Sequence, residues 1–591
     1  MAPSALPVRT QELPPSGERR RAAPRLQVVY RSTAPSRPDG VIAFLDERAR
    51  QYGAREALAL RDGDGWRAWS YDELRERSAS LSAYLVERGL EPGARLVILS
   101  ESRPEWSVAF FAAVCAGGVA LPLDCLLTAR ELTPILDDAR PRVLFTSRAE
   151  LEKAEALAQS ASEPVELVLL DDDGEPGRAP SYRELRAHGP RPRARERRWE
   201  EACVLTYTSG TTGAPKGVMT SFASLLHQAR TLHGLLDEER EESLVSILPL
   251  HHLLELVGGL LTPLYAGSRV AYAGSLLPLD VMAALKARGA TRMIVVPLFL
   301  QLVRKQIFRS LEASPARARA FALMFFFAAL LPWRPLRRLL FARVHRAFGG
   351  RLSCFICGGA PLDEDTERFF TRLGVDVYAG YGLTETSPVI SVNVPGARRR
   401  GSVGRPLPGV EVRIASDGEI LTRGPHLMLG YWGRPDETRA VIDADGFFHT
   451  GDLGEIDDDT FLRITGRKKS LIVLPSGKKV SPEEVEGALL DLDLVDELCV
   501  LGARTAAGSP RGEAVCCLAV PSARARAVHG EGDALRLAVG DEIRRRVAVL
   551  APHKRPTALA LTLRPLPRTS TRKVKRAQAR ALFEALQEDR S

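Results

Sequence analysis

The sequence predicts an α/β protein built mainly on parallel sheet, followed by a small β unit and a separate C-terminal unit. From residue 40 onward, short runs rich in aliphatic and β-branched residues alternate with segments of helical apolar spacing, which is typical of parallel α/β layers. After about residue 391 the helical spacing thins out, and short strands with Gly and Pro turns are expected to about residue 465. Helical and strand patterns resume from residue 467.

The elements of the α/β region follow a biased N-terminal segment. Residues 1–37 are rich in Pro and Arg and poor in aromatics, which predicts a disordered tail. Helical spacing predicts helices over residues 40–52 and 72–88. Short apolar runs predict strands over residues 94–99, 143–146, 165–170 and 202–206. The Pro- and Arg-rich residues 185–198 are expected to form a surface connection.

The C-terminal unit is expected to combine helices and strands. The pattern predicts a helix over residues 482–490, strands near 498–501 and 514–520, and a final helix from residue 577. A chain of 591 residues has room for about four folding units of ordinary size.

Composition excludes several classes of protein. With 45% hydrophobic and 26% charged residues, the chain is neither mainly disordered, fibrous nor a polytopic membrane protein. The net charge of +9 comes from dispersed arginines, aromatics make up only 6%, and no recognition motif is visible, so we expect no nucleic-acid partner. No apolar core of a signal peptide is visible, and the longest uncharged apolar run, residues 320–331, is shorter than the roughly 20 residues that span a bilayer. We therefore expect a cytoplasmic protein.

The cysteines point to a reducing compartment. Eight in 591 residues is sparse, and most lie in apolar runs. Cys354 and Cys357 form a CxxC without a second pair at zinc spacing, so we expect both to pack in the core.

The strongest chemical signal is the stretch LTYTSGTTGAPKG at residues 205–217. It follows a predicted strand and combines three glycines, several hydroxyl side chains and one lysine. Glycines let the backbone approach a phosphate, successive N–H groups form an anion site, and the lysine adds a positive charge. The lysine falls too late for the GxxxxGK[ST] loop, and no Ser or Thr follows it. The stretch therefore predicts a phosphate-binding loop of another kind.

Together with five further motifs, this loop resembles the acyl-adenylating (AMP-forming) superfamily of acyl-CoA synthetases, peptide-synthetase adenylation domains and luciferases. The motifs, in the family's order, are TSGTTGAPKG at 208–217, GGAPL at 358–362, YGLTETSP at 381–388, HTGDLG at 449–454, GRKKS at 466–470 and PRTSTRKVKR at 567–576. The resemblance covers about residues 40–585 and is strongest to long-chain fatty acyl-CoA synthetases.

The resemblance implies a domain organisation. A large N-terminal AMP-binding adenylation domain, residues 38–466, would contain two stacked α/β subdomains and a small β subdomain at about 391–465. A small mobile α+β C-terminal domain, residues 467–591, would carry the catalytic lysine and rotate about a hinge at Lys469. Taken singly, Lys468–Lys469 and Lys478–Lys479 equally fit solvated turn charges.

The resemblance also implies the residues of the site. The phosphates of ATP would be cradled by Thr208, Ser209, Gly210, Thr211, Thr212 and Lys216. Gly359, Ala360 and Tyr381 would form the adenine slot, and Asp452 would accept hydrogen bonds from the ribose hydroxyls beside Arg467. Thr384 would contact the α-phosphate, while Glu385 and Thr208 would bind Mg²⁺. Lys573 would bridge the carboxylate and the phosphate during adenylation.

These residue types suit carboxylate activation. A carboxylate is a poor acyl donor because oxide is a poor leaving group, so attack on the α-phosphate of ATP first gives an acyl-adenylate and pyrophosphate. A thiol then displaces AMP.

Two positions depart from the commonest pattern: Arg572 replaces the glycine that usually precedes the lysine, and Val473 stands where some relatives carry lysine. Neither change removes a catalytic group.

The class of carboxylic acid substrate is predicted from the residues that match the family's acyl-binding region. His252 matches the family's gate to the acyl pocket, and Glu255 matches long-chain members. The segment 297–358 is longer than in short-acid and aryl-acid branches. Residues 320–346 combine an apolar run with a basic flank, in which Leu336, Leu339, Leu340 and Val344 fall mainly on one helical face. This pattern fits peripheral membrane contact, and equally a core helix with a solvated arginine face.

The leading interpretation is a long-chain fatty acid–CoA ligase that uses ATP, Mg²⁺ and CoA. One alternative is a fatty acyl-AMP ligase that loads an acyl carrier protein, although no insertion is visible between residues 465 and 480. A synthetase for a shorter or aryl acid is another. A non-catalytic membrane or nucleic-acid binder, or an acyl-binding relative without turnover, is disfavoured because Lys216, Glu385, Asp452 and Lys573 are all present.

Overall fold

The structure is a computed structural model of the 591-residue chain. It describes residues 40–171, 198–208, 215–236, 242–275, 277–312, 314–331, 333–490, 492–503, 513–568 and 574–588. The predicted tail 1–37 and nearly all of the connection 185–198 lie outside these residues. The chain forms two compact units: unit 1 comprises residues up to 413, 422–448 and 458–461, and unit 2 comprises 414–421, 449–457 and 462 onward.

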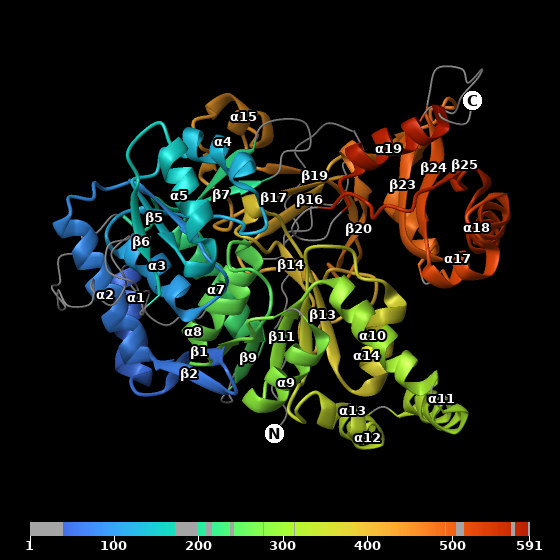
Figure 1. Ribbon diagram of the computed structural model, residues 1–591, viewed down its shortest axis with the longest axis horizontal. Helices are drawn as coiled ribbons and strands as arrows, with labels where there is room; N and C mark the ends of the chain where they lie inside the picture. The colour runs from blue at the N-terminus through green and yellow to red at the C-terminus, as the bar shows by residue number, and fades with distance from the viewer. Residues whose placement is uncertain are drawn as a thin grey trace, which may run out of the picture. The chain divides into compact units, whose positions relative to one another are not determined.

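Unit 1 contains a seven-stranded sheet with the order β18-β8-β7-β4-β3-β5-β6 (Figure 1). Its strands are β3 (Arg95–Leu99), β4 (Val119–Pro122), β5 (Val143–Thr146), β6 (Glu166–Leu169), β7 (Ala202–Thr208), β8 (Lys216–Ser221) and β18 (Gly430–Tyr431). The pairs from β7 to β6 are parallel, whereas β8 is antiparallel to both β7 and β18. All four strands predicted for the α/β region are confirmed.

A nine-stranded sheet has the order β15-β14-β13-β12-β11-β9-β10-β1-β2. Its strands are β1 (Glu56–Asp62), β2 (Gly65–Ser70), β9 (Ser243–Ser246), β10 (Arg269–Tyr272), β11 (Arg292–Val295), β12 (Cys354–Cys357), β13 (Asp376–Tyr381), β14 (Ser391–Val392) and β15 (Arg405–Pro406). The strands from β13 to β1 are parallel, and the edge strands are antiparallel. Cys354 and Cys357 are buried in β12, as the apolar context predicts.

Helices pack between and around these sheets. They are α1 (Val41–Tyr52), α2 (Tyr71–Glu87), α3 (Pro104–Cys115), α4 (Ala129–Ala139), α5 (Leu151–Ser160), α7 (Phe222–Leu235), α8 (Thr262–Ala266), α9 (Pro278–Arg288), α10 (Pro297–Glu312), α11 (Pro315–Leu330), α12 (Arg334–Leu340), α13 (Ala342–Ala347), α14 (Glu364–Leu373) and α15 (Pro435–Val441). The helices predicted over 40–52 and 72–88 are confirmed as α1 and α2. A capping box of Ser70 and Glu73 fixes the start of α2, because each side chain accepts from the other's backbone N–H.

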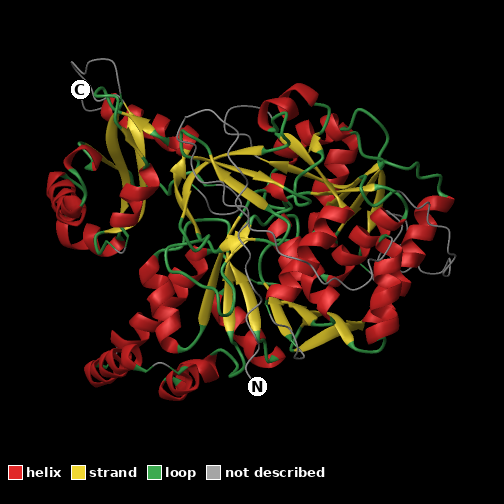
Figure 2. Ribbon diagram, turned by 180° about the vertical axis from the view of Figure 1, so that it is seen from behind, coloured by secondary structure: helices red, strands yellow, loops and turns green. Residues whose placement is uncertain are grey.

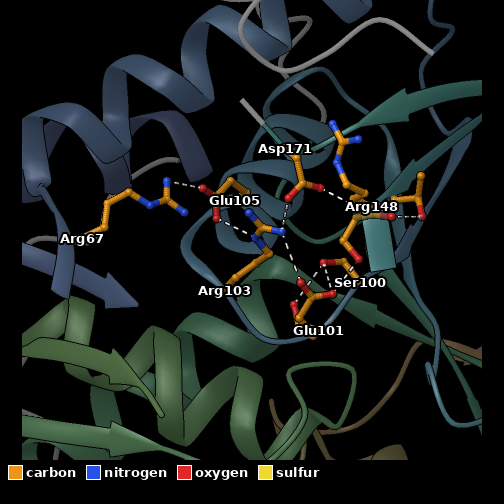
Figure 3. Close-up of polar contacts among 9 residues, drawn as sticks. Arg67, Ser100, Glu101, Arg103, Glu105, Arg148 and Asp171 are labelled. Atoms are coloured by element: carbon orange, nitrogen blue, oxygen red, sulfur yellow. Dashed lines mark hydrogen bonds and ion pairs between the residues drawn. The ribbon is translucent and has the colours of Figure 1, made fainter. Parts of the chain in front are cut away.

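A buried ion-pair network joins the two α/β layers (Figure 3). Arg103, at the start of α3, donates to Glu105 at 2.9 Å and to Asp171 at 2.7 Å, and it pairs with Glu101 at 3.2 Å. Glu105 also pairs at 2.5 Å with Arg67 of β2, which belongs to the other sheet. Because Glu105 is buried and pairs with an arginine from each layer, replacing Arg67 or Arg103 would remove one of its two cationic partners, so the network fixes how the layers meet.

The region predicted as a small β unit is divided between sheets. Strands β14 and β15 extend the nine-stranded sheet. A separate four-stranded sheet has the order β16-β17-β19-β20, from β16 (Glu411–Ile414), β17 (Glu419–Arg423), β19 (Phe448–Ile456) and β20 (Leu462–Arg467). The domain boundary at residues 466 and 467 stays a prediction.

Unit 2 has its own hydrophobic core, which includes Val480, Val515 and Val539. Figure 2 draws its strands in yellow and its helices in red. Strands β23 (Val495–Ala503), β24 (Ala514–Pro521) and β25 (Ala558–Leu561) form a mixed sheet, and β21 (Ile472–Val473) pairs with β22 (Lys479–Val480). The helices are α16 (Pro482–Ala488), α17 (Ala523–His529), α18 (Asp533–Arg546) and α19 (Arg576–Glu588). The helices and strands predicted for this part of the chain are confirmed. Across the described residues of both units, no helix combines the length and apolar character needed to cross a membrane.

Candidate active site

Four parallel strands of the nine-stranded sheet bring predicted site residues to one edge. Strands β13, β12, β11 and β9 are neighbours, so their carboxyl ends lie side by side. Tyr381 ends β13, Gly359 and Ala360 follow β12, and His252 follows β9. The structure therefore places the predicted adenine slot and the predicted acyl gate along one sheet edge of unit 1.

The turn after β13 carries Thr384 and Glu385 on a short 3₁₀ segment, Thr384–Thr386. A Cβ at Gly382 would lie 1.8 Å from the carbonyl oxygen of Pro388, so only glycine permits this close approach. Gln228, buried on α7, donates to the carbonyl of Val389 at 2.8 Å. These contacts fix the turn that presents Glu385.

The predicted phosphate loop begins and ends on paired strands. Thr208 ends β7 and faces Lys216, the first residue of β8, across the antiparallel pair. Residues 209–214, which include the predicted Ser209, Gly210, Thr211 and Thr212, lie outside the described residues. Thr208 and Lys216 therefore fix the two ends of the loop in space.

Tyr431 connects this hairpin to Glu385. Its hydroxyl donates to Glu385 Oε1 at 3.0 Å, and its backbone pairs with Val218 of β8. The Lys216 ammonium lies 5.3 Å from the centre of the Tyr431 ring. Burial and the neighbouring Glu385 carboxylate raise the pKa of Tyr431, so the hydroxyl keeps its proton and remains a donor at neutral pH. Two predicted site residues, Lys216 and Glu385, thus meet at a residue that the sequence analysis missed, and a third, Thr208, faces Lys216.

Glu437 is the second missed residue. It forms an ion pair with Lys216, and it accepts from Arg434 at 3.1 Å. Lys216 and Arg434 together hold the pKa of the Glu437 carboxyl below its usual range. The sequence carries only a weak signal for this residue, because an acidic side chain in the first turn of a helix that begins with Pro435 is ordinary helix chemistry.

The site thus brings the Glu385 carboxylate and the Lys216 ammonium to the Tyr431 side chain, on the hairpin that carries the predicted phosphate loop. The sequence profile described as AMP-binding enzyme matches residues 45–432. The chain belongs to this family of AMP-binding enzymes.

Relatives of this AMP-binding enzyme include several acid–CoA ligases. Long-chain-fatty-acid–CoA ligase FadD15 of Mycobacterium bovis is 33% identical over 72% of this chain and 73% of its own length. Feruloyl-CoA synthase of Amycolatopsis is 30% identical over 93% of this chain and 100% of its own. Among solved structures, ATP-bound MatB from Rhodopseudomonas palustris has a TM-score of 0.74 at 27% identity, covering 93% of this chain and 100% of that one. This likeness confirms the predicted α/β fold class.

Unit 2 of the AMP-binding enzyme holds the predicted ribose residues. Asp452 of β19 and Arg467 of β20 are register partners, and Arg467 Nε donates to Asp452 Oδ1 at 2.7 Å. Asp452 is buried, so this ion pair orients its carboxylate. Lys468 and the predicted hinge residue Lys469 are both exposed, and Lys468 pairs with Asp417 at 2.7 Å and with Glu419 at 2.9 Å. Lys468 is therefore more than a solvated turn charge.

Lys573 lies in residues 569–573, outside the described residues, but the base of this loop is described. Arg568 and Val574 form an antiparallel bridge, and the Lys575 N–H donates to the carbonyl of Pro567 at 2.7 Å. Arg568 also donates to Glu497 of β23 at 3.1 Å. The two ends of the loop are therefore held together on the sheet of unit 2.

A buried carboxyl lies next to the predicted gate. Glu255, on the π-helix Glu255–Leu261, is fully buried and accepts from the Ser246 hydroxyl at 2.5 Å. A Cβ at Gly259 would lie 2.3 Å from Glu255 Oε1, so glycine makes room for the carboxyl. Burial raises the pKa of Glu255 to about 8 and lowers the pKa of His251 to about 4. Both groups are therefore mainly uncharged at neutral pH.

Replacing Glu255 with glutamine is expected to change the pH dependence of stability. The folded protein keeps the Glu255 proton up to a pH of about 8, whereas the unfolded chain loses it near 4.5. Since the folded state then binds more protons, this group makes the wild type less stable as pH rises between these values and has no further effect above them. The gain in thermal midpoint of Glu255→Gln over wild type should grow from about pH 5 to pH 8 and then level off.

Differential scanning calorimetry of both proteins over this pH range measures the effect. Glu152→Gln, at an exposed position of α5, is the matched control and should follow the wild type at every pH. A stability gain for Glu255→Gln that is constant with pH would contradict the prediction.

Proposed function

We propose that the protein is an ATP-dependent, AMP-forming acid–CoA ligase and that its acid is a long-chain fatty acid. A carboxylate oxygen attacks the α-phosphorus of ATP, the bond to the bridging oxygen breaks, and pyrophosphate leaves. The CoA sulfur then attacks the acyl carbon and gives up its proton, and AMP leaves with the ester oxygen. The observation that carries this proposal is that Lys216 and Glu385 meet at Tyr431, with Thr208 facing Lys216 across the strand pair.

In this proposal the predicted site residues that the structure describes have the following roles. Lys216 and the loop that it closes would neutralise phosphate charge, and Thr384 would contact the α-phosphate. Glu385 and Thr208 offer oxygen ligands of the kind that Mg²⁺ prefers, and Tyr431 holds the carboxylate in place. The magnesium ion would polarise the phosphates. Asp452 and Arg467 would bind the ribose, His252 would line the acyl entrance, and Lys469 would be the hinge.

Two observations support a long-chain acid. FadD15 of Mycobacterium bovis, a long-chain-fatty-acid–CoA ligase, is 33% identical to this chain. The segment between β11 and β12 holds four helices, α10 to α13, in accordance with the length that favours long-chain members. An aryl acid is the second candidate, because feruloyl-CoA synthase matches 93% of this chain at 30% identity. An acyl carrier protein as acceptor is the alternative to CoA.

A ladder of acids tests the substrate and the acceptor together. Purified protein is incubated with ATP, Mg²⁺ and CoA and with acids from acetate to oleate, plus ferulate, and product masses are read with and without CoA. We expect acyl-CoA to peak at long chains. A product peak at ferulate would mean that the substrate is an aryl acid and not a fatty acid. If acyl-AMP accumulates whether or not CoA is present, the acyl acceptor is a carrier protein and not CoA.

A further inference from the structure

Helix α11 of unit 1 has two apolar faces, and the residues that the structure describes cover only one of them. Phe321 and Ala328 are buried, and Met324 and Phe325 pack against the same core, which is the spacing of one helical face. The other face carries Leu323, Phe326, Phe327 and Leu330, which are exposed by half or more. Exposed large apolar residues gathered on one face mark an interaction site.

The exposed face continues beyond the end of α11. Trp333 is 68% exposed and Leu339 of α12 is 73% exposed. We call the six residues Leu323, Phe326, Phe327, Leu330, Trp333 and Leu339 the apolar surface. Figures 1 and 2 show α11 and α12 at the rim of unit 1.

The prediction of one apolar face after Pro335 is wrong in part, because the helix breaks at Phe341: Leu336 and Leu339 are exposed, whereas Leu340 and Val344 pack on the core.

The charge along this stretch of the chain has one sign. Residues 313–362 contain eight arginines and no Asp, Glu or Lys. Three of these arginines serve the fold: Arg334, Arg337 and Arg338 donate to backbone carbonyls. Four others are exposed on either side of the apolar surface: Arg317 and Arg319 before it, Arg343 and Arg346 after it. An apolar patch between exposed cations is suited to a surface that offers both acyl chains and negative charge.

We propose that the apolar surface inserts into the interface of an anionic lipid bilayer, with the four exposed arginines against the headgroups. A second copy of this chain fits less well, because a two-fold contact over this surface would bring its flanking arginines near their own copies. The bilayer also accommodates Trp333, since an indole favours the headgroup level. The surface does not depend on the proposed ligase activity, although a substrate drawn from lipid would give it a use.

Vesicle flotation of the full chain, without ATP or acid, tests the proposal. We expect binding to vesicles of phosphatidylcholine mixed with phosphatidylglycerol, much weaker binding to phosphatidylcholine alone, and loss of binding at high salt. The triple variant Phe326→Ser, Phe327→Ser, Leu330→Ser should bind about tenfold more weakly or worse. Its matched control, Leu279→Ser, Leu537→Ser, Val549→Ser, changes exposed apolar residues elsewhere and should bind like the wild type.

A second pair of variants tests the charges. Replacing Arg317, Arg319, Arg343 and Arg346 with glutamine should remove the preference for anionic vesicles, whereas the same change at the exposed Arg50, Arg130, Arg524 and Arg545 should leave most of it. Brominated lipid should quench Trp333, measured as the difference between wild type and Trp333→Phe. Melting temperatures near that of the wild type establish that each variant is folded.

Three results would overturn the proposal. In the first, the wild type does not bind anionic vesicles. In the second, the triple variant binds them as tightly as its control variant does. In the third, the wild type is a dimer that the triple variant converts to a monomer without any vesicle binding, which assigns the surface to a second copy. Since none of these readouts uses acyl-CoA formation, they leave the proposed ligase function untouched.

Discussion

Replacing Lys573 with alanine is expected to reduce acyl-adenylate formation by about 10²–10³-fold, because the attack on ATP would lose a cation aimed at the charge that develops there. The second half-reaction, CoA with supplied acyl-adenylate, should keep nearly its full rate, since the rotation expected about Lys469 would withdraw Lys573 from the phosphate before this step. Pyrophosphate release measures the first step and thioester formation the second.

Lys575→Ala is the matched control for Lys573→Ala. Lys575 lies two residues away in the same basic segment. Its described hydrogen bonds, to Pro567, Gln578 and Ala579, use backbone atoms and survive the substitution. The control should adenylate at close to the wild-type rate. Equal losses in the two variants would mean that the segment contributes only general positive charge, and the assignment of Lys573 would be wrong. The departure at Arg572 can be examined in the same assay with Arg572→Gly.

Replacing Glu385 with glutamine is expected to lower kcat/KM for ATP by about 10²-fold and to shift the Mg²⁺ requirement to higher concentration. The amide keeps the shape of the side chain and its carbonyl oxygen still accepts from Tyr431, but it removes the negative charge that a divalent cation needs. Initial rates over a matrix of ATP and Mg²⁺ concentrations measure both effects.

Tyr431→Phe separates the charge of Glu385 from its position. This variant keeps the carboxylate and loses the hydrogen bond that orients it, and such a bond to a charged group contributes about 1.5–3 kcal/mol. We expect a loss of at least tenfold in kcat/KM, smaller than that of Glu385→Gln, with little change in the Mg²⁺ requirement. If the Mg²⁺ requirement of Glu385→Gln is unchanged, Glu385 is not a ligand of the metal ion.

Much of the site was predictable because its parts are local. The motifs at 208–217, 381–388, 449–454 and 466–470 can each be recognised from a few consecutive residues. Local patterns also predicted the strands and helices around them. Tyr431, Glu437 and Gln228 were missed for the opposite reason. Each contacts a site element far away in the chain, and a lone aromatic, acidic or amide residue carries no local sign of such a contact.

The sequence by itself determined that this protein has an α/β fold with a phosphate loop, and it named residues for an adenylating site. Only the tertiary structure decided that Tyr431 joins Glu385 to the hairpin of Lys216, and that β1 and β2 complete a sheet whose other strands come some 170 residues or more later. It also decided that half of the apolar run at 320–331 faces outward. The physical reason is that periodicity reveals which side chains are apolar or charged, whereas burial and pairing depend on which distant segments come to cover them.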